Sequence, residues 1–135
     1  MIAEKPSIAK TIAEILSDES YKQYTFDNSM VIYAFKNYFK GIFSYFTVTS
    51  VKGHLYENIY EQMYDKTKPV ESYEYTIIKT LENTTENIPI FLRHISKNKD
   101  ILCLWIDCDP EGENICYEII HNTLPYMKLI LSAGL

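Results

Sequence analysis

The residues best suited to chemistry lie in one acidic segment, Asp107-Cys-Asp-Pro-Glu-Gly-Glu113, which directly follows a continuous apolar run. Asp107 and Asp109 are two residues apart, so an extended backbone would point both carboxylates the same way. Glu111 continues this alternation if the extended path persists. Carboxylates crowded this closely repel each other. Either some of them stay protonated, or a cation neutralises them.

Oxygen ligands with no histidine beside them favour Mg²⁺ over zinc or copper. A helix expected to begin near Glu111 or Gly112 would point its positive end at this segment. Gly112 also removes a side chain where the backbone would approach a bound phosphate. The alternative is that acidic residues simply favour a helix N-terminus and bind no metal. The position straight after a buried strand, where α/β sheets bind ligands, keeps both interpretations open.

Glu4 is a second candidate for the same site. It lies at the tip of the first expected strand and at the start of the first expected helix. If that strand lies beside the one ending at Ile106, the Glu4 carboxylate faces Asp107. The alternative is a first-turn glutamate that interacts only with its own helix dipole.

Length and composition limit the classes of protein. The chain has 135 residues, enough for one domain with one core. No apolar run approaches the roughly 20 residues that span a bilayer, and the N-terminus lacks the pattern of a secretion signal, so we expect a soluble, intracellular protein. The net charge of −5 argues against tight binding of nucleic acid by this chain alone, because such binding depends on clustered Lys and Arg. Three cysteines, Cys103, Cys108 and Cys116, lack zinc-site spacing, and we expect no disulfide.

The hydrophobic periodicity predicts alternating strands and helices. Strands are expected at residues 1–3, 30–35, 45–51, 101–106 and 128–132, and helices at 6–18, 87–97 and from about 111 to Pro125. A turn containing Gly41 separates the second and third strands, and residues 57–75 receive no assignment. The 12 tyrosines are interpreted as strand formers and packing residues rather than a stacking platform for nucleic acid.

The run at residues 101–106 has the length and continuous apolar character of a central parallel strand covered on both faces. Strand, acidic segment, helix and strand then form a right-handed crossover unit. We therefore expect an α/β fold with a central, mostly parallel sheet of about four strands flanked by helices.

Four separated segments together resemble one family in their order along the chain. They are Ala3-Glu-Lys-Pro-Ser-Ile-Ala-Lys10, Val48-Thr-Ser-Val-Lys-Gly-His-Leu55, Leu104-Trp-Ile-Asp-Cys-Asp-Pro-Glu-Gly-Glu-Asn-Ile115 and Lys128-Leu-Ile-Leu-Ser-Ala133. They resemble the Toprim domain of type IA DNA topoisomerases, with the eukaryote-like topoisomerase III the most similar. The resemblance implies a Rossmann-like Toprim fold over residues 1–135 as a single domain, part of a longer enzyme.

The resemblance also implies a metal site. Asp107, Asp109 and Glu111 match the family's Mg²⁺ ligands, and Glu113 matches a position that bonds across the loop. Glu4 matches a glutamate that acts beside the metal and assists proton transfer during cleavage and religation.

Two further residues gain roles from the resemblance. Lys5 matches a lysine that stabilises charge on the scissile phosphate, and the alternative is a solvated first-turn lysine. His54 matches a histidine near the active site, and the alternative is a packed turn histidine. Both alternatives stay open.

The chain departs from the family pattern at several positions. Pro110 stands where the family usually has arginine, and Lys128 and Ile130 replace two arginines of the closing segment. A single ammonium does not reproduce the bidentate contact of a guanidinium, so these changes put DNA affinity in doubt more than metal binding. The family's nucleophilic tyrosine is expected in a later domain, and the chain alone is expected to be inactive.

The resemblance implies DNA as substrate, through a single-stranded segment, with a helicase or scaffold protein as partner and a nuclear location. It implies no membrane. Two rival functions remain. One is a Toprim nuclease or primase-type enzyme, which shares the acidic segment. The other is a noncatalytic module that only docks a partner.

Overall fold

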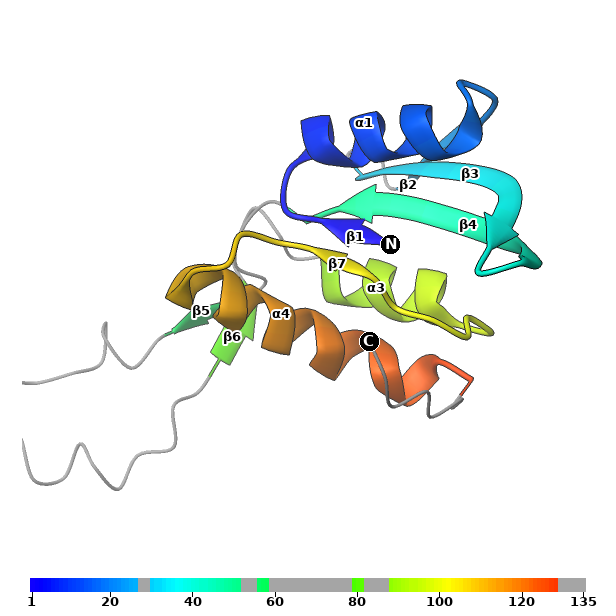
Figure 1. The fold of residues 1–135 in the computed structure, drawn as a ribbon. Helices are drawn as coiled ribbons and strands as arrows, with labels where there is room; N and C mark the ends of the chain where they lie inside the picture. The colour runs from blue at the N-terminus through cyan, green and yellow to red at the C-terminus, as the bar shows by residue number, and fades with distance from the viewer. Residues whose placement is uncertain (27–29, 52–55, 59–78, 82–87, 129–135) are drawn as a thin grey trace, which may run out of the picture.

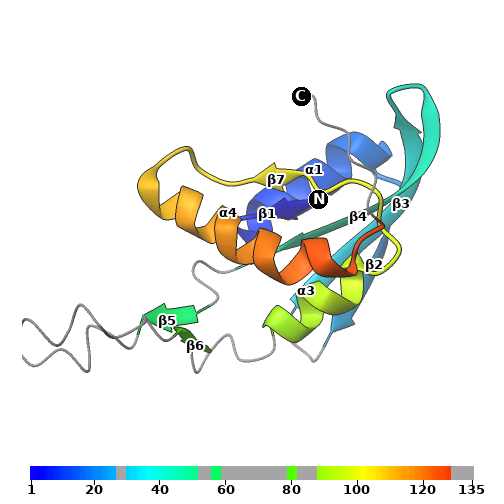
Figure 2. The ribbon, with the colours of Figure 1, turned by 90° about the horizontal axis from the view of Figure 1, so that it is seen from below.

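The computed structural model describes residues 1–26, 30–51, 56–58, 79–81 and 88–128. Within these ranges a five-stranded sheet carries helix α1 on one face and helices α3 and α4 on the other (Figure 1). Seen from below, α3 and α4 lie side by side across the same face (Figure 2). The expected α/β class with flanking helices is confirmed.

The strands are β1 (Ile2–Ala3), β2 (Lys22–Phe26), β3 (Met30–Phe39), β4 (Ile42–Ser50), β5 (Tyr56–Asn58), β6 (Lys79–Leu81) and β7 (Leu104–Trp105). The helices are α1 (Pro6–Ser17), α3 (Ile88–Ser96), α4 (Pro110–Thr123) and the 3₁₀ turn η2 (Leu124–Tyr126).

The main sheet has the order β2-β3-β4-β1-β7, and β5 pairs with β6 in a separate two-stranded sheet. β1 is parallel to both of its neighbours, β4 and β7. The pairs β2–β3 and β3–β4 are antiparallel. A parallel centre is therefore extended on one side by an antiparallel arm, and the carboxyl ends of β4, β1 and β7 meet at one edge.

Helix α1 forms where the sequence predicts it. Pro6 occupies its first turn, where a missing N–H removes no hydrogen bond. Asp18 ends it in the left-handed conformation, with φ 53°. The buried face of the helix, which includes Ala9 and Ile12, packs with Phe35 and Val48 of the sheet.

The second half of the core lies between the sheet and helices α3 and α4. Phe91 and Leu92 of α3 are buried with Ile115 and Ile119 of α4. The strand residues on this side include Ile2. Since one side chain of β1 faces each helical layer, this short strand connects both halves of the core.

Several expected strand boundaries need correction. β3 and β4 extend further toward their shared turn than predicted, where Gly41 has φ 80° as a turn glycine requires. β2 was not predicted, because its short sequence Lys-Gln-Tyr-Thr-Phe is polar and mostly exposed. The segment expected at 128–132 lies, apart from Lys128, outside the described residues, as does nearly all of 57–75.

The apolar run at residues 101–106 contains a strand parallel to β1, as predicted, but this strand is shorter than expected and is not covered on both faces. Only Leu104 and Trp105 form a strand, and neither is buried. Ile101 and Trp105 keep 52% and 47% of their surface exposed. Within the described part of the chain β7 pairs with β1 alone, and the further strand expected at 128–132 lies, apart from Lys128, outside the described residues.

No helix in the described ranges combines the length and the apolar character that crossing a membrane requires.

The buried face of α3 gives a direct test of the packing. Replacing Leu92, which is fully buried, with Ala should lower the free energy of unfolding by about 2–5 kcal/mol, because transfer energy is lost and a cavity remains. The control is Ile90→Ala on the same helix, where the side chain is 58% exposed and the change should stay within about 0.5 kcal/mol. Urea unfolding of both variants measures the difference. Equal losses would contradict this placement of α3.

Candidate acidic site at the carboxyl edge of the sheet

The pairing of β1 with β7 brings two distant parts of the sequence together. Ile2 lies opposite Leu104, and Ala3 lies opposite Trp105. The ladder continues one step beyond the strand, because the Glu4 N–H donates to the Trp105 carbonyl at 3.1 Å. Since both strands run in the same direction, the residues that follow them emerge at the same edge (Figure 1).

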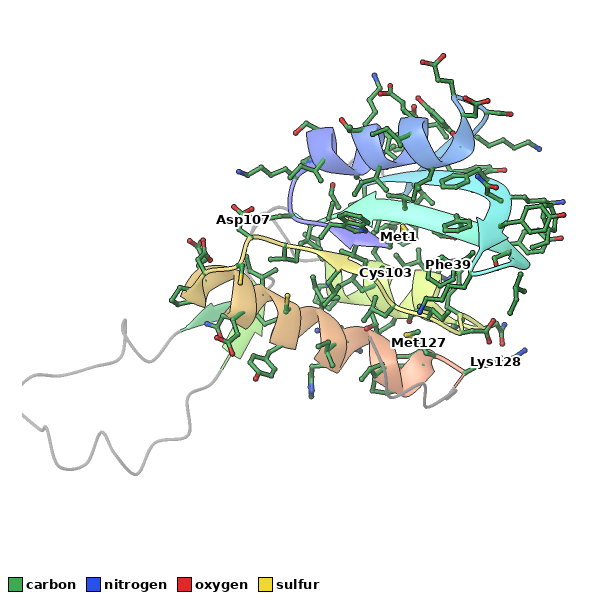
Figure 3. All side chains as sticks on the ribbon, viewed as in Figure 1. Met1, Phe39, Cys103, Asp107, Met127 and Lys128 are labelled. Carbon is green, nitrogen blue, oxygen red and sulfur yellow. The ribbon has the colours of Figure 1, made fainter. Side chains whose placement is uncertain are left out.

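Glu4 reaches the acidic segment directly. Its Oε2 accepts a hydrogen bond from the Asp107 N–H at 3.2 Å. Glu4 is half-buried and Asp107 is exposed at the tip of the connection between β7 and α4 (Figure 3). The structure thus brings Glu4 and the Asp107 loop together as the sequence indicated. The backbone donor that joins them was not foreseen, because side-chain spacing carries no signal for it.

Asp109 has a structural role that the sequence analysis missed. It is the N-cap of α4, and its Oδ1 accepts from the Gly112 N–H at 2.6 Å. An Asp followed by Pro at the first helical position is a recognisable helix start, so a signal was present. A carboxylate at this position satisfies an otherwise unpaired donor and stabilises the helix N-terminus.

The extended path, on which alternation at Glu111 depended, does not continue past Asp109. The Asp109 N–H donates to the Asp107 carbonyl at 3.0 Å, which makes a tight turn. Pro110 then begins α4, so Glu111 is already helical. Strict alternation of side chains therefore ends at Asp109, and Glu111 and Glu113 lie in the first helical turn, where acidic side chains are favoured.

Gly112 permits the loop to pack closely on the helix. A Cβ at this position would overlap the backbone carbonyl of Asp107 and lie 3.1 Å from Cγ2 of Ile106. The residue is fully buried. Glycine is therefore required here by approach of the protein's own backbone.

One side chain on α4, that of Cys116, has a shifted pKa. Burial raises the pKa of the Cys116 thiol, and the neighbouring Glu113 carboxylate raises it further. The Glu113 side chain is exposed, and its backbone N–H donates to the Asp109 carbonyl at 2.9 Å. The predicted bond of Glu113 across the loop stays a prediction.

The two remaining predicted residues differ in what the structure says of them. Lys5 is the N-cap of α1, its side chain is exposed, and it adjoins Glu4 at the same edge. Its carbonyl accepts from the Ile8 and Ala9 N–H groups, both at 3.1 Å. His54 lies outside the described residues.

The donor set fits Mg²⁺ in its chemistry, since the predicted ligands Asp107, Asp109 and Glu111 are all carboxylates, with Glu4 at the same edge of the sheet. Among the residues that the structure describes, however, no three His, Cys, Asp or Glu side chains are arranged to hold a metal ion. A carboxylate accepts more than one contact, so the cap does not exhaust Asp109. The ligand set stays a prediction that requires rotation of side chains at the loop.

Comparison with known families is decisive for the fold. The model of the Toprim domain matches residues 1–132. The chain belongs to the Toprim domain family. The family assignment agrees with the parallel β1–β7 pair and the acidic loop after β7, and it covers the edge that carries Glu4 and Asp107.

Relatives of this Toprim domain confirm the resemblance to topoisomerase III. It is 36% identical to DNA topoisomerase 3-beta of Arabidopsis thaliana over 126 residues, which cover 91% of this chain and 14% of the relative. It is also 36% identical to DNA topoisomerase 3-beta-1 of Homo sapiens over 133 residues, which cover 95% of this chain and 15% of the relative. Against DNA topoisomerase 3-alpha of Arabidopsis thaliana the identity is 33%, over 88% of this chain and 13% of the relative. The chain thus spans about one seventh of these relatives.

The close packing at Gly112 makes a local prediction. Gly112→Ala should lower the free energy of unfolding by about 1–3 kcal/mol, because the added methyl group forces the Asp107 carbonyl away from the helix. Asn114→Ala, two residues along the same helix and exposed, should change it by less than about 0.5 kcal/mol. Urea unfolding measures both changes. A Gly112→Ala variant as stable as the parent would show that the loop does not pack on α4 as described.

Proposed function

We propose that this Toprim domain supplies the acidic half of the active site of a type IA DNA topoisomerase of the topoisomerase III kind. The observation that carries the proposal is the contact between Glu4 Oε2 and the Asp107 N–H, which unites the two acidic motifs at one edge. The similarity to DNA topoisomerases 3 supports it over most of the chain.

In this proposal Asp107, Asp109 and Glu111 hold Mg²⁺ through carboxylate oxygens. The bound ion would offset charge on the phosphate at the scissile position. Asp109 would keep its cap to Gly112 through Oδ1, and its second carboxylate oxygen would serve the ion. The positive end of α4 points at the same loop, which eases the crowding of negative charge.

Glu4 and Lys5 then act on the two sides of the scissile bond. Glu4, which lies at the same edge as the acidic loop, would handle the proton of the leaving 3′ oxygen, a role that requires it to lie within hydrogen-bond reach of that oxygen. The exposed Lys5 ammonium stabilises charge on the phosphate. His54 contributes a contact near the same site.

The complete reaction that we propose also needs residues of the enzyme that lie outside this chain. The chain is a single Toprim domain over residues 1–135, and a tyrosine in another domain of the same enzyme attacks the DNA strand. The resulting 5′-phosphotyrosine link conserves bond energy for religation after strand passage. The substrate is a single-stranded segment of DNA, a helicase or scaffold protein is the partner, and the enzyme acts in the nucleus.

One observation favours a different function, a noncatalytic module that only docks a partner. Across the described ranges, the acidic side chains do not form a ready metal-binding group. Pro110, in the place of the family's arginine, starts α4 and offers no charge to a phosphate. A chain that shows no response to Mg²⁺ would support this alternative.

Substitutions of the acidic loop separate metal binding from helix capping. Asp109→Asn retains the cap but removes a charge, so it should weaken Mg²⁺ binding while leaving the melting temperature unchanged. Asp109→Ala should also lose about 0.5–2 kcal/mol of stability with the cap. Asp107→Asn should abolish the binding heat. Isothermal titration calorimetry with MgCl₂ measures the binding, and thermal unfolding measures the stability.

The control is Asp100→Asn, an exposed aspartate outside the loop, which should bind Mg²⁺ as the parent does. Undiminished binding in the Asp107→Asn variant would refute the metal site. Supercoiled DNA incubated with this chain and Mg²⁺ provides the second arm. The proposal expects no cleavage, and nicking by the chain alone would favour a Toprim nuclease instead.

A further inference from the structure

The hairpin of β3 and β4 exposes a row of aromatic and basic side chains. In the antiparallel register Lys36 lies opposite Tyr45, and Tyr38 lies opposite Phe43, so these four residues share one face. We call them the hairpin stripe. Tyr38 is 69% exposed, Phe43 56% and Tyr45 71%. The other face of the same strands carries the buried Tyr33 and Phe35, which pack with α1, so the stripe is not part of that core.

The rings of the stripe contact one another and the neighbouring lysines. The Tyr38 and Phe43 rings meet edge to face, with centroids 5.4 Å apart. The Lys36 ammonium lies 4.9 Å from the centroid of the Tyr45 ring. At the turn, the Lys40 ammonium lies 5.8 Å from the Phe39 ring. Exposed rings with lysines beside them match the two features by which proteins bind single strands, namely stacking on bases and attraction of phosphates.

The charge of this region is opposite to that of the chain. The whole chain has a net charge of −5, yet the two hairpin strands and their turn, residues 30–50, contain two lysines and no aspartate or glutamate. Figure 3 places Phe39 at the hairpin end and Asp107 at the opposite end of the sheet. A polyanion repelled by the acidic loop would therefore meet a basic, aromatic surface at this end.

A cavity lies directly beside the stripe. Its volume is about 330 Å³, at the lower end of the range for ligand sites, and Phe43 and Tyr45 are among its lining residues. Lys99 also lines this cavity. Its ammonium donates to the Thr47 hydroxyl at 2.9 Å, which holds the ammonium at the cavity wall. Asp100 is the only acidic residue among the described residues that line it.

The amine of Met1 also lines this cavity but contributes little charge at neutral pH. It donates to the Thr47 carbonyl at 2.7 Å. Burial lowers the pKa of this amine to about 6, with Lys99 adding to the effect and Cys103 opposing it. Lys99 is therefore the main cation on the cavity wall above that pH.

We propose that the hairpin stripe and the adjoining cavity bind single-stranded nucleic acid, with bases stacked on Tyr38 and Tyr45 and phosphates near Lys36 and Lys99. Tyr38 and Tyr45 lie in strands, as the sequence analysis expects of the tyrosines, but their rings are exposed rather than packed in the core. A protein partner with an apolar surface would pack on the same rings. It would gain less binding energy than a polyanion does from the lysines beside them. This binding needs neither the acidic loop nor a metal ion, so it stands or fails separately from the proposed function.

Fluorescence anisotropy of labelled 15-nucleotide probes, dT15 and rU15, tests this proposal in EDTA at low salt. The double variant Tyr38→Leu/Tyr45→Leu keeps apolar surface but removes the stacking rings, so affinity for the bound probe should fall by about 10-fold or more. Lys36→Gln should weaken binding of both probes and reduce its dependence on salt. Equal affinity for dT15 and rU15 assigns the site to single strands in general, and a difference identifies the sugar that it prefers.

The matched controls lie elsewhere on the surface. Tyr117→Leu removes a ring that is 63% exposed on α4, and Lys10→Gln removes an exposed lysine on α1. Both should bind the probes as the parent does. Circular dichroism checks that each variant is folded. Unchanged affinity in the folded double tyrosine variant would overturn the proposal. The proposal would also be overturned if light scattering showed that this variant had lost self-association while its binding of the probes was unchanged.

Discussion

The parallel pairing of β1 with β7 is the interaction on which the rest of the structure depends. Only two residues of each strand take part, with Ile2 opposite Leu104 and Ala3 opposite Trp105. A slip of one residue would exchange the two faces of β1, so that Ile2 would leave the α3–α4 side and Ala3 the α1 side. The same slip would displace Glu4 from the Asp107 N–H. Core packing and the acidic site therefore require the same register.

The sheet separates two kinds of surface. Its carboxyl edge gathers Glu4, Lys5 and the acidic loop around the N-terminus of α4, where backbone donors and a helix dipole favour negative charge. The opposite end presents exposed rings and lysines on the β3–β4 hairpin. Lys36 and Lys40 thus give the hairpin a local positive charge, although the net charge of the chain is −5.

Periodicity predicted the helices well, since α1 and α3 each bury one apolar face and proline opens α1. It failed for β2, whose side chains are mostly exposed and carry no alternation. At residues 101–106 it predicted the parallel strand but not its short length or its exposed side chains. At the site, the meeting of Glu4 with the Asp107 loop was predictable from strand order. The cap by Asp109 had a signal in the Asp-Pro pair, whereas the contact at Gly112 depends on backbone geometry that side-chain spacing does not record.

The central claim is that one cation site spans both acidic motifs, and paramagnetic broadening by Mn²⁺ tests it most directly. Sub-stoichiometric MnCl₂, added to the ¹⁵N-labelled chain, should broaden the amide signals of Glu4, Lys5 and residues 107–113 together, while those of Phe39 and Lys40 at the other end of the sheet stay sharp. Broadening restricted to the start of α4, with Glu4 and Lys5 unaffected, would contradict the claim that the two motifs share a site.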